Sequence, residues 1–421
     1  MRGKFLYKYC CLLIVLCLGF GGCGNMPKEQ EQKDFRSNSV KSHEASGSAP
    51  DTIMASEPGA GQEPGILVED SFLEEGSGFA RRSLSDAELL WYRDMERILG
   101  SYGTDEELSD EALEEGLDEK DIDRIFQCVL NDHPELFYVD GYSYVKYTQY
   151  GQEDDILSVE FSGRYSMDRE EAKRRQGQIQ EAVEMILAGI DEDAGQYEKV
   201  KYVYDTLIRE TDYRLDSEDN QNIYSVFVNH LSVCQGYAKA TQYLLNRMGV
   251  ECALVLGTVE TGEGHAWNLV NVDGSYYYLD TTWGDASYQL DEDGTGTRHT
   301  MPEINYDYLN VTTEELLRTH SLDRKQHMPL CIDTAANYYV REGALFDSYD
   351  RVQMTSLFER ALTQGRTDVT VKCATRECYD EIFTALVDEK EIFGYLPDDG
   401  QRIAYTQNDV QLSMTFWVTK E

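Results

Sequence analysis

The sequence predicts a core of helices followed by an antiparallel sheet, because helical and strand patterns occupy separate stretches of the chain. Apolar residues at helical spacing mark two long helices, at residues 168–190 and 196–212. Three strand-like runs then follow one another at residues 251–260, 265–272 and 276–280, without a helix between them. Strands that succeed one another through short turns pair as antiparallel neighbours, which is typical of a core with segregated helices and sheet.

A helical and hairpin region is predicted before this core, at residues 81–165. Two stripes of apolar residues indicate amphipathic helices, and the segment Asp132-His133-Pro134 ends the second of them. His133 precedes a proline, so we interpret it as a turn residue. The predicted elements are helices from residue 83 onward and at 121–130, then strands at 142–150 and 156–165.

The core is predicted to cover residues 166–330 and to be followed by a small α/β appendage at residues 331–421. A further helix is expected at residues 221–230. The appendage shows no residue pattern that indicates chemistry, so we interpret it as a binding or packing module. Its predicted elements are strands at 338–341, 369–373, 402–405 and 411–418 and helices at 350–363 and 376–387.

The charge balance restricts the class of partner. The 421 residues include 38 Lys+Arg against 78 Asp+Glu, a formal net charge of −40. A basic surface cannot be assembled from this composition, which argues against nucleic acid or anionic lipid as a binding partner.

The first 23 residues are predicted to be a secretory signal. Arg2, Lys4 and Lys8 precede a short apolar run at residues 9–20, too short to favour a membrane-spanning helix. Gly21-Gly22-Cys23 resembles the bacterial lipobox, although Phe20 stands where an aliphatic residue is usual. Lipidation of Cys23 would anchor the chain to the outer face of a bacterial membrane, and ordinary cleavage near Gly22 is the alternative.

Residues 24–80 are predicted to be a disordered tether. They are rich in Ser, Gly, Glu, Gln and Pro and poor in aromatic residues. Such a segment cannot bury enough apolar surface to fold, so it would hold the folded part away from the bilayer.

Cys234 is the strongest candidate for a nucleophile. After it, apolar residues at helical spacing lead to Gly249, a typical helix terminator. Cys234 is therefore expected at a helix N-terminus, where unpaired N–H groups and the helix dipole favour the thiolate.

His265 begins the second predicted strand and Asp280 ends the third. In antiparallel neighbours the start of one strand lies beside the end of the next, which would bring the two side chains together. With Cys234 they would form a Cys-His-Asp triad, in which the imidazole transfers the thiol proton and the carboxylate fixes the tautomer.

Three ordered segments resemble the signature of the bacterial transglutaminase-like superfamily. They are Val233-Cys234-Gln235-Gly236-Tyr237-Ala238, Gly264-His265-Ala266-Trp267-Asn268 and the run from Tyr278 to Asp285. The resemblance implies a papain-like α+β core and gives the catalytic roles to Cys234, His265 and Asp280.

The oxyanion of an acyl-transfer reaction also needs hydrogen-bond donors. The Cys234 backbone N–H is one such donor. Gln221 and Asn222 are candidates for a second donor by position and residue type. The alternative is that each is an ordinary helix-start residue.

No cofactor and no metal are predicted. The cysteines after the signal segment lack the paired spacing of a zinc site, and the acidic stretch 291–294 lacks the spacing of a calcium loop. The odd number of cysteines left beside Cys234 argues against a complete disulfide framework but leaves a Cys373–Cys378 bridge open. The six in question are Cys128, Cys234, Cys252, Cys331, Cys373 and Cys378.

Together these observations predict an extracytoplasmic, lipid-anchored enzyme that acts on peptide or protein amide bonds. Water as acceptor would make it a peptidase or amidase, which the resemblance to the bacterial family favours, and an amine would make it a transglutaminase. The alternative is a surface module that binds peptide or glycan without turnover. The sequence does not indicate an oligomeric state.

Overall fold

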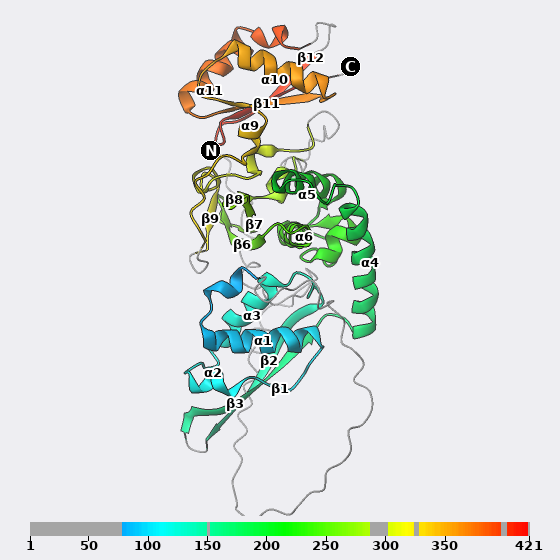
Figure 1. Ribbon diagram of the computed structural model, residues 1–421, viewed down its shortest axis with the longest axis vertical. Coiled ribbons are helices and arrows are strands. Elements are labelled where there is room, and N and C mark those ends of the chain that lie inside the picture. Colours follow the sequence, from blue (N-terminus) through cyan, green and yellow to red (C-terminus); the bar gives the residue numbers. More distant parts are fainter. Residues whose placement is uncertain (1–77, 150–151, 287–301, 324–327, 397–401, 420–421) are drawn as a thin grey trace, which may run out of the picture. The chain divides into compact units, whose positions relative to one another are not determined.

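A computed structural model describes residues 78–149, 152–286, 302–323, 328–396 and 402–419 (Figure 1). The predicted signal segment, Cys23, nearly all of the predicted tether and the acidic stretch 291–294 lie outside these residues. The chain divides into two compact units, Met1–Gln180 and Glu181–Glu421. The five-part division predicted from the sequence stays a prediction.

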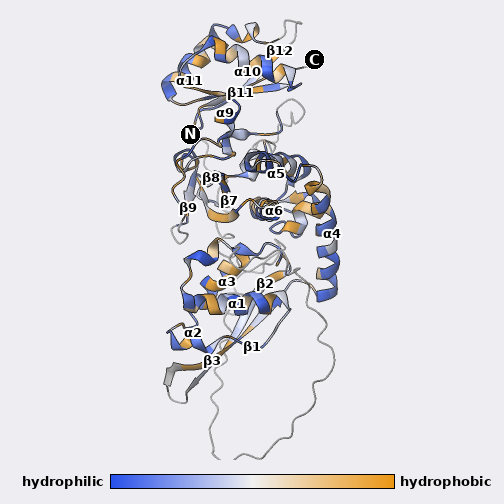
Figure 2. Cartoon of the chain, viewed as in Figure 1, coloured by the Kyte–Doolittle hydropathy of each residue, from blue (hydrophilic) through white to orange (hydrophobic). Residues whose placement is uncertain are grey.

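The first unit consists of helices packed on a three-stranded sheet. Ser85 caps α1, accepting from the Glu88 backbone, while the Glu88 side chain accepts from the Ser85 backbone. Bands of hydrophobic and hydrophilic residues alternate along α1 and α3 (Figure 2), as expected of helices with one buried face. The predicted helices and hairpin are therefore confirmed. The elements are η2 (Ala80–Ser83), α1 (Asp86–Gly100), β1 (Glu106–Glu107), α2 (Asp110–Glu114), α3 (Asp121–Asp132), β2 (Val139–Gln149) and β3 (Gln152–Tyr165), in the sheet order β1-β3-β2.

His133 follows α3 as its C-cap residue, in agreement with its interpretation as a turn residue. Its ring lies between carboxylates, with Nδ1 2.8 Å from Glu135 and Nε2 3.3 Å from Glu96. The neighbouring Asp132 accepts from the backbone N–H groups of Ala80 and Arg81. These bonds attach η2 to the end of α3.

The second unit contains the core, in which helices pack against an antiparallel sheet of order β8-β7-β6-β9. The three predicted strands are confirmed, and β9 is a fourth that the sequence analysis missed. The core elements are α4 (Arg169–Leu187), which contains the boundary between the units, α5 (Gln196–Glu210), β4 (Asp212–Tyr213), η3 (Ser225–Asn229), β5 (Leu231–Ser232), α6 (Cys234–Arg247), β6 (Cys252–Val259), β7 (Gly264–Val272), β8 (Ser275–Leu279), α7 (Thr281–Gly284), η4 (Tyr306–Tyr308), α8 (Thr313–Leu316) and β9 (His320–Leu322).

The helix α6 begins and ends where its sequence predicts. Gly249 adopts a φ of 75°, the left-handed conformation that ends helices. By contrast, the helix predicted at residues 221–230 is too long, because residues 221 and 222 form a turn and the helical part ends at Asn229. His230, which follows, is left-handed with a φ of 57°.

The remaining residues of the second unit form a mixed sheet with helices. The strand predicted at residues 338–341 is wrong. These residues form the short helix α9, because the Asn337 side chain accepts from the Tyr339 backbone N–H and caps a helical turn. The elements are α9 (Tyr338–Arg341), β10 (Leu345–Phe346), α10 (Arg351–Thr363), β11 (Asp368–Cys373), α11 (Arg376–Phe383), η5 (Thr384–Asp388), η6 (Glu391–Gly394), β12 (Arg402–Asn408) and β13 (Ser413–Thr419), with the sheet order β10-β11-β13-β12.

The described residues combine helices with largely antiparallel sheets, so the predicted α+β class is confirmed. Within the described part of the chain, none of the helices combines the length and apolar character that crossing a membrane requires.

A buried carboxylate joins the core to the C-terminal sheet. Asp307 in η4 is 2% exposed. Its Oδ1 accepts from the Tyr339 hydroxyl at 3.0 Å and lies 3.5 Å from Lys372 Nζ. Its Oδ2 accepts from Asn408 Nδ2 at 2.9 Å and from Ser413 Oγ at 2.7 Å. We call these five residues the Asp307 cluster.

Asp307→Ala should destabilise the second unit by about 3 kcal/mol, because it leaves the buried Lys372 ammonium and three polar groups without their acceptor. The measurement is the urea midpoint and slope of the purified chain. The exposed Glu359→Gln is the control and should change the free energy of unfolding by less than about 0.5 kcal/mol. Equal midpoints for both variants would contradict the role assigned to this cluster.

Candidate active site

Cys234 is the first residue of α6, and the chain that precedes it is tightly held. Ser232 Oγ donates to the Asn220 carbonyl at 2.8 Å. Gly236 makes this approach possible, since a Cβ there would lie 2.0 Å from Ser232 Oγ and 3.0 Å from the Asn220 oxygen. As the first helical residue, Cys234 directs its N–H out of the helix ladder. Its side chain is half-buried and packs against Ala238, Leu254 and Ala266.

His265 and Asp280 come together through the pairing of β7 with β8. Asn268 pairs with Leu279, so the start of β7 lies beside the residue that follows β8. His265 Nε2 lies 2.7 Å from Asp280 Oδ2, and both side chains are almost fully buried. The predicted contact between these two residues is therefore present.

Asp280 is held from two sides. Its Oδ1 accepts from the backbone N–H groups of Thr282 and Trp283, at 2.9 and 3.0 Å, which makes it the N-cap of α7. Its Oδ2 faces His265 and also His320 Nε2, at 3.0 Å. Burial alone would raise the pKa of Asp280, but the charge of His265 and the hydrogen bonds from both histidines hold it well below its usual range.

The Cys234 thiol, the third member of the predicted triad, is a hydrogen-bonding partner of His265. Burial alone would lower the pKa of His265, but the Asp280 carboxylate, with Cys234 as a hydrogen-bonding and charge partner, raises it from 6.5 to about 10. Because Nε2 faces Asp280, Nδ1 is the nitrogen left for the thiol. The structure thus brings Cys234, His265 and Asp280 together, and their role in catalysis stays a prediction.

His320 is the residue of this cluster that the sequence analysis missed. It begins β9 and is 2% exposed. Aromatic rings enclose the two imidazoles. Trp267 stacks on His265 with ring centroids 5.8 Å apart, and the centroid of Trp283 lies 4.8 Å from that of His320. Such a wall limits the access of water to the buried charges.

His265, Asp280 and His320 offer potential metal-ligand atoms within 4.8 Å of one another. Both Nε2 atoms face the same Asp280 oxygen at hydrogen-bond distance, and these hydrogen bonds account for the cluster. The expectation of a site without metal or cofactor stays a prediction.

The residues proposed for the oxyanion lie in the turn before η3. Asn222 Oδ1 accepts from the Tyr224 backbone N–H at 2.9 Å, so it caps the helical turn that follows. This contact fits the alternative interpretation of Asn222 as a helix-start residue. Gln221 lies beside it in the same turn. A role for either in binding an oxyanion stays a prediction.

The cysteines of the described residues are free thiols, and the bridge left open between Cys373 and Cys378 is not formed. Cys128 has the same intermediate exposure as Cys234 but a different environment. Burial, together with the charge of Asp132, raises the pKa of Cys128 to about 11.

The sequence model of the transglutaminase-like superfamily matches residues 183–281, a range that includes Cys234, His265 and Asp280. The chain carries a transglutaminase-like domain. The comparison with curated proteins found no match.

Two solved structures resemble parts of the chain. One is a crystal structure of a TGase, 13% identical, covering 34% of this chain and 51% of that one with a TM-score of 0.24. Another is a "putative protease" from Parabacteroides distasonis, 14% identical, covering 33% and 39% with a TM-score of 0.20. The matched region thus covers about half of the first structure's chain and 39% of the second structure's chain.

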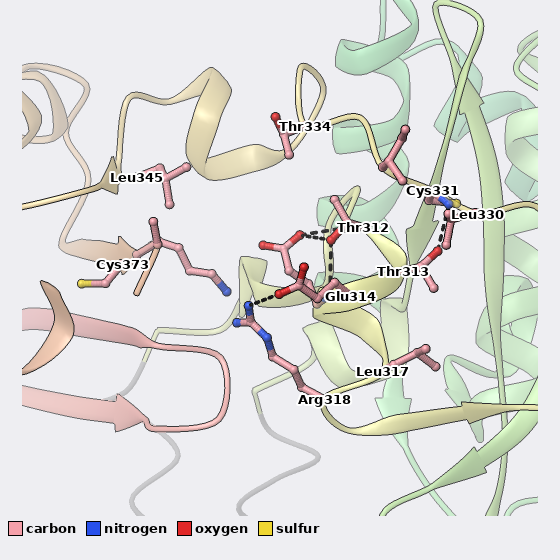
Figure 3. A pocket seen from close by; sticks show the side chains of 14 residues that line it. Thr312, Thr313, Glu314, Leu317, Arg318, Leu330, Cys331, Thr334, Leu345 and Cys373 are labelled. Carbon is pink, nitrogen blue, oxygen red and sulfur yellow. Dashed lines mark hydrogen bonds and ion pairs between the residues drawn. The ribbon is translucent and has the colours of Figure 1, made fainter. Parts of the chain in front are cut away.

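A separate cleft of about 580 Å³ lies beyond the transglutaminase-like match, between α8 and the end of β11 (Figure 3). Its lining includes the largely exposed Leu330 and Ile332, with Arg318 3.9 Å from Glu314. Cys234, His265 and Asp280 are not among the residues that line it. The cleft is therefore distinct from the candidate active site.

The stability that His265 provides should depend on pH. Its pKa in the folded chain lies above 6.5, so its contribution is complete below pH 6.5 and is lost as the pH rises toward about 10. The contribution of Asp280, whose pKa is lowered, is present above pH 3.8 and lost below it. The difference in Tm between the wild-type chain and His265→Gln should therefore shrink as the pH rises from 6.5 to about 10.

The matched control is His230→Asn, at an exposed position where φ is 57°, a conformation that Asn tolerates. Its difference from wild type should be constant over the same range. A constant difference for His265→Gln as well would contradict the raised pKa.

Proposed function

We propose that the chain is a cysteine-dependent acyl-transfer enzyme that acts on peptide amide bonds, with Cys234 as nucleophile, His265 as general base and acid, and Asp280 as the residue that orients His265. The observation that carries the proposal is the buried His265–Asp280 pair, with the Cys234 thiol as the other partner of the imidazole. The match to the transglutaminase-like superfamily over residues 183–281 supports the same chemistry.

The proposed reaction has two halves. Because its pKa is raised to about 10, His265 already holds the thiol proton as an imidazolium at neutral pH, and the Cys234 sulfur attacks the amide carbonyl carbon to form a tetrahedral oxyanion. The Cys234 backbone N–H, at the start of α6, is a donor for that oxyanion. As the C–N bond breaks, the imidazolium gives its proton to the leaving amine, and an acyl thioester with Cys234 remains.

In the second half, His265 takes a proton from the incoming acceptor, which attacks the thioester carbon and releases the thiol. Water as acceptor gives a carboxylic acid, and a primary amine gives a new amide. We favour water, and thus a peptidase or amidase. Asp280 keeps the Nε2–H of His265 directed to its own carboxylate, which leaves Nδ1 for each proton transfer.

The same proposal includes the location. Residues 1–23 would direct export and Cys23 would carry the lipid anchor, so that the enzyme would act on peptides or proteins outside the bacterial membrane. Loss of membrane association in a Cys23→Ala chain is the expected result of cell fractionation.

Cys234 should be alkylated by iodoacetamide faster than Cys128 at pH 7. The two thiols have the same class of exposure, but only Cys234 lies beside an imidazole. His265→Ala should slow alkylation of Cys234 by about tenfold, because an unassisted thiol is only a few per cent ionised at this pH. Mass spectrometry of the modified peptides gives both rates in one sample.

Alkylation of Cys128 is the internal control and should not respond to His265→Ala. Equal, slow labelling of both cysteines in the wild-type chain would contradict the enzyme and support the alternative, a surface module that binds peptide or glycan without turnover.

The acceptor can be determined with a glutamine-containing peptide library and a labelled primary amine. Release of shorter peptides or of ammonia without incorporated label is the outcome that we expect for a hydrolase. Incorporation of the amine in preference to hydrolysis would instead identify a transglutaminase. Cys234→Ala is the control for both measurements.

A further inference from the structure

The pairing of β9 with β6 brings His320 to the side of the sheet that carries His265. On β6, Gly257 pairs with His265 and Val259 pairs with His320. Residues directly opposite each other share a face, as do alternate residues of one strand, so both histidines project from the same face.

Gly257 makes this approach possible. A Cβ at this position would lie 2.1 Å from the Ser321 carbonyl oxygen and 2.5 Å from the Trp267 ring. Any side chain would therefore push β9 or Trp267 away. The glycine allows His320 to reach Asp280 from a strand of only three residues.

Both ring nitrogens of His320 have partners. Nε2 lies 3.0 Å from Asp280 Oδ2, and Nδ1 lies 2.8 Å from Thr319 Oγ1. The Tyr308 hydroxyl is 3.5 Å from the same Thr319 oxygen. With 2% exposure, the imidazole has little access to water, so these protein groups determine its orientation.

The partners also determine the tautomer. An ionised carboxylate only accepts hydrogen bonds, so Nε2 of His320 carries a proton directed at Asp280. Nδ1 of that tautomer accepts the hydroxyl proton of Thr319, whose other acceptor, the Leu316 carbonyl, is more distant at 3.4 Å. The ring thus presents one fixed N–H donor to the carboxylate.

This donor completes the set of hydrogen bonds that the Asp280 carboxylate accepts. Oδ1 already accepts two backbone N–H groups, and Oδ2 accepts His265 at 2.7 Å. A carboxylate has about four lone-pair sites, so His320 supplies the fourth donor. Three of the four donors are independent of His265, and they hold the carboxylate in place while His265 gains and loses its proton at Nδ1.

We propose that His320 is a positioning residue of the candidate active site, which donates Nε2–H to Asp280 and thereby fixes the carboxylate that orients His265 toward Cys234. This inference rests on the proposed function of the Cys-His-Asp cluster. His320 acts through Asp280, and its partners among the described residues are Asp280 and Thr319.

Two substitutions distinguish the hydrogen bond that His320 donates to Asp280 from the space that its ring fills. His320→Leu fills similar space without a donor, whereas the amide of His320→Gln can place an N–H group near the position of Nε2. With iodoacetamide as probe, we expect Cys234 to react about tenfold more slowly in His320→Leu, in the range typical for lost outer-shell partners. His320→Gln should react at a rate closer to wild type.

The control is Ser321→Ala, an exposed position on the same strand, which should react as wild type does. The Tm of each variant shows whether it is folded. A wild-type rate in His320→Leu would overturn the proposal, as would a folded His320→Gln that is as slow as His320→Leu.

The nitrogen NMR spectrum of ¹⁵N-histidine-labelled protein gives a second, independent readout. We expect His320 to be protonated at Nε2 and unprotonated at Nδ1, and the His265 Nε2 signal to shift in His320→Leu. Protonation of neutral His320 at Nδ1 alone would overturn the proposal. If wild-type Cys234 reacted no faster than Cys128, the proposed function would fail, while this spectrum would still decide the role of His320.

Discussion

The buried carboxylate of Asp280 is the group on which the rest of the site depends. An ionised carboxylate is costly to bury unless donors replace the water it loses. Here the donors come from three separate elements: the first turn of α7, His265 on β7 and His320 on β9. The order of the sheet and the start of a helix are therefore constrained by one charge. The position of the Asp280 carboxylate determines which nitrogen of His265 faces it and which nitrogen is left for Cys234.

The short helix η4 connects this charge to the rest of the second unit, because its three residues face three different partners. The Tyr306 hydroxyl donates to Asp205 on α5 at 3.0 Å. Asp307 holds the C-terminal sheet through its cluster. The Tyr308 carbonyl accepts from the Asp280 backbone N–H at 3.0 Å. The residue that follows β8, the helix α5 and the C-terminal sheet are thus positioned against a single turn of chain.

The sequence was sufficient where local patterns carry the structure. Periodicity located α6, β7 and β8, and antiparallel pairing then brought His265 and Asp280 together. It was not sufficient for His320, because β9 is three residues long and pairs with a strand about sixty residues earlier, which no local pattern records. Residues 338–341 were misassigned because Tyr-Tyr-Val favours strands. The capping signal of Asn337, which decides for a helix, was present in the sequence.

The Asp307 cluster has a consequence for where this protein can be divided. The family match ends at residue 281, yet the carboxylate that follows it in η4 finds its partners in α9, β11, β12 and β13. A fragment trimmed to residues 183–281 would lack η4 and the Tyr308 carbonyl that accepts from the Asp280 backbone N–H, and a fragment that ended between η4 and α9 would leave Asp307 without its partners. The smallest piece that keeps the Asp307 cluster intact therefore extends to the last strand, and recombination that exchanges this domain between proteins would have to transfer the C-terminal sheet with it.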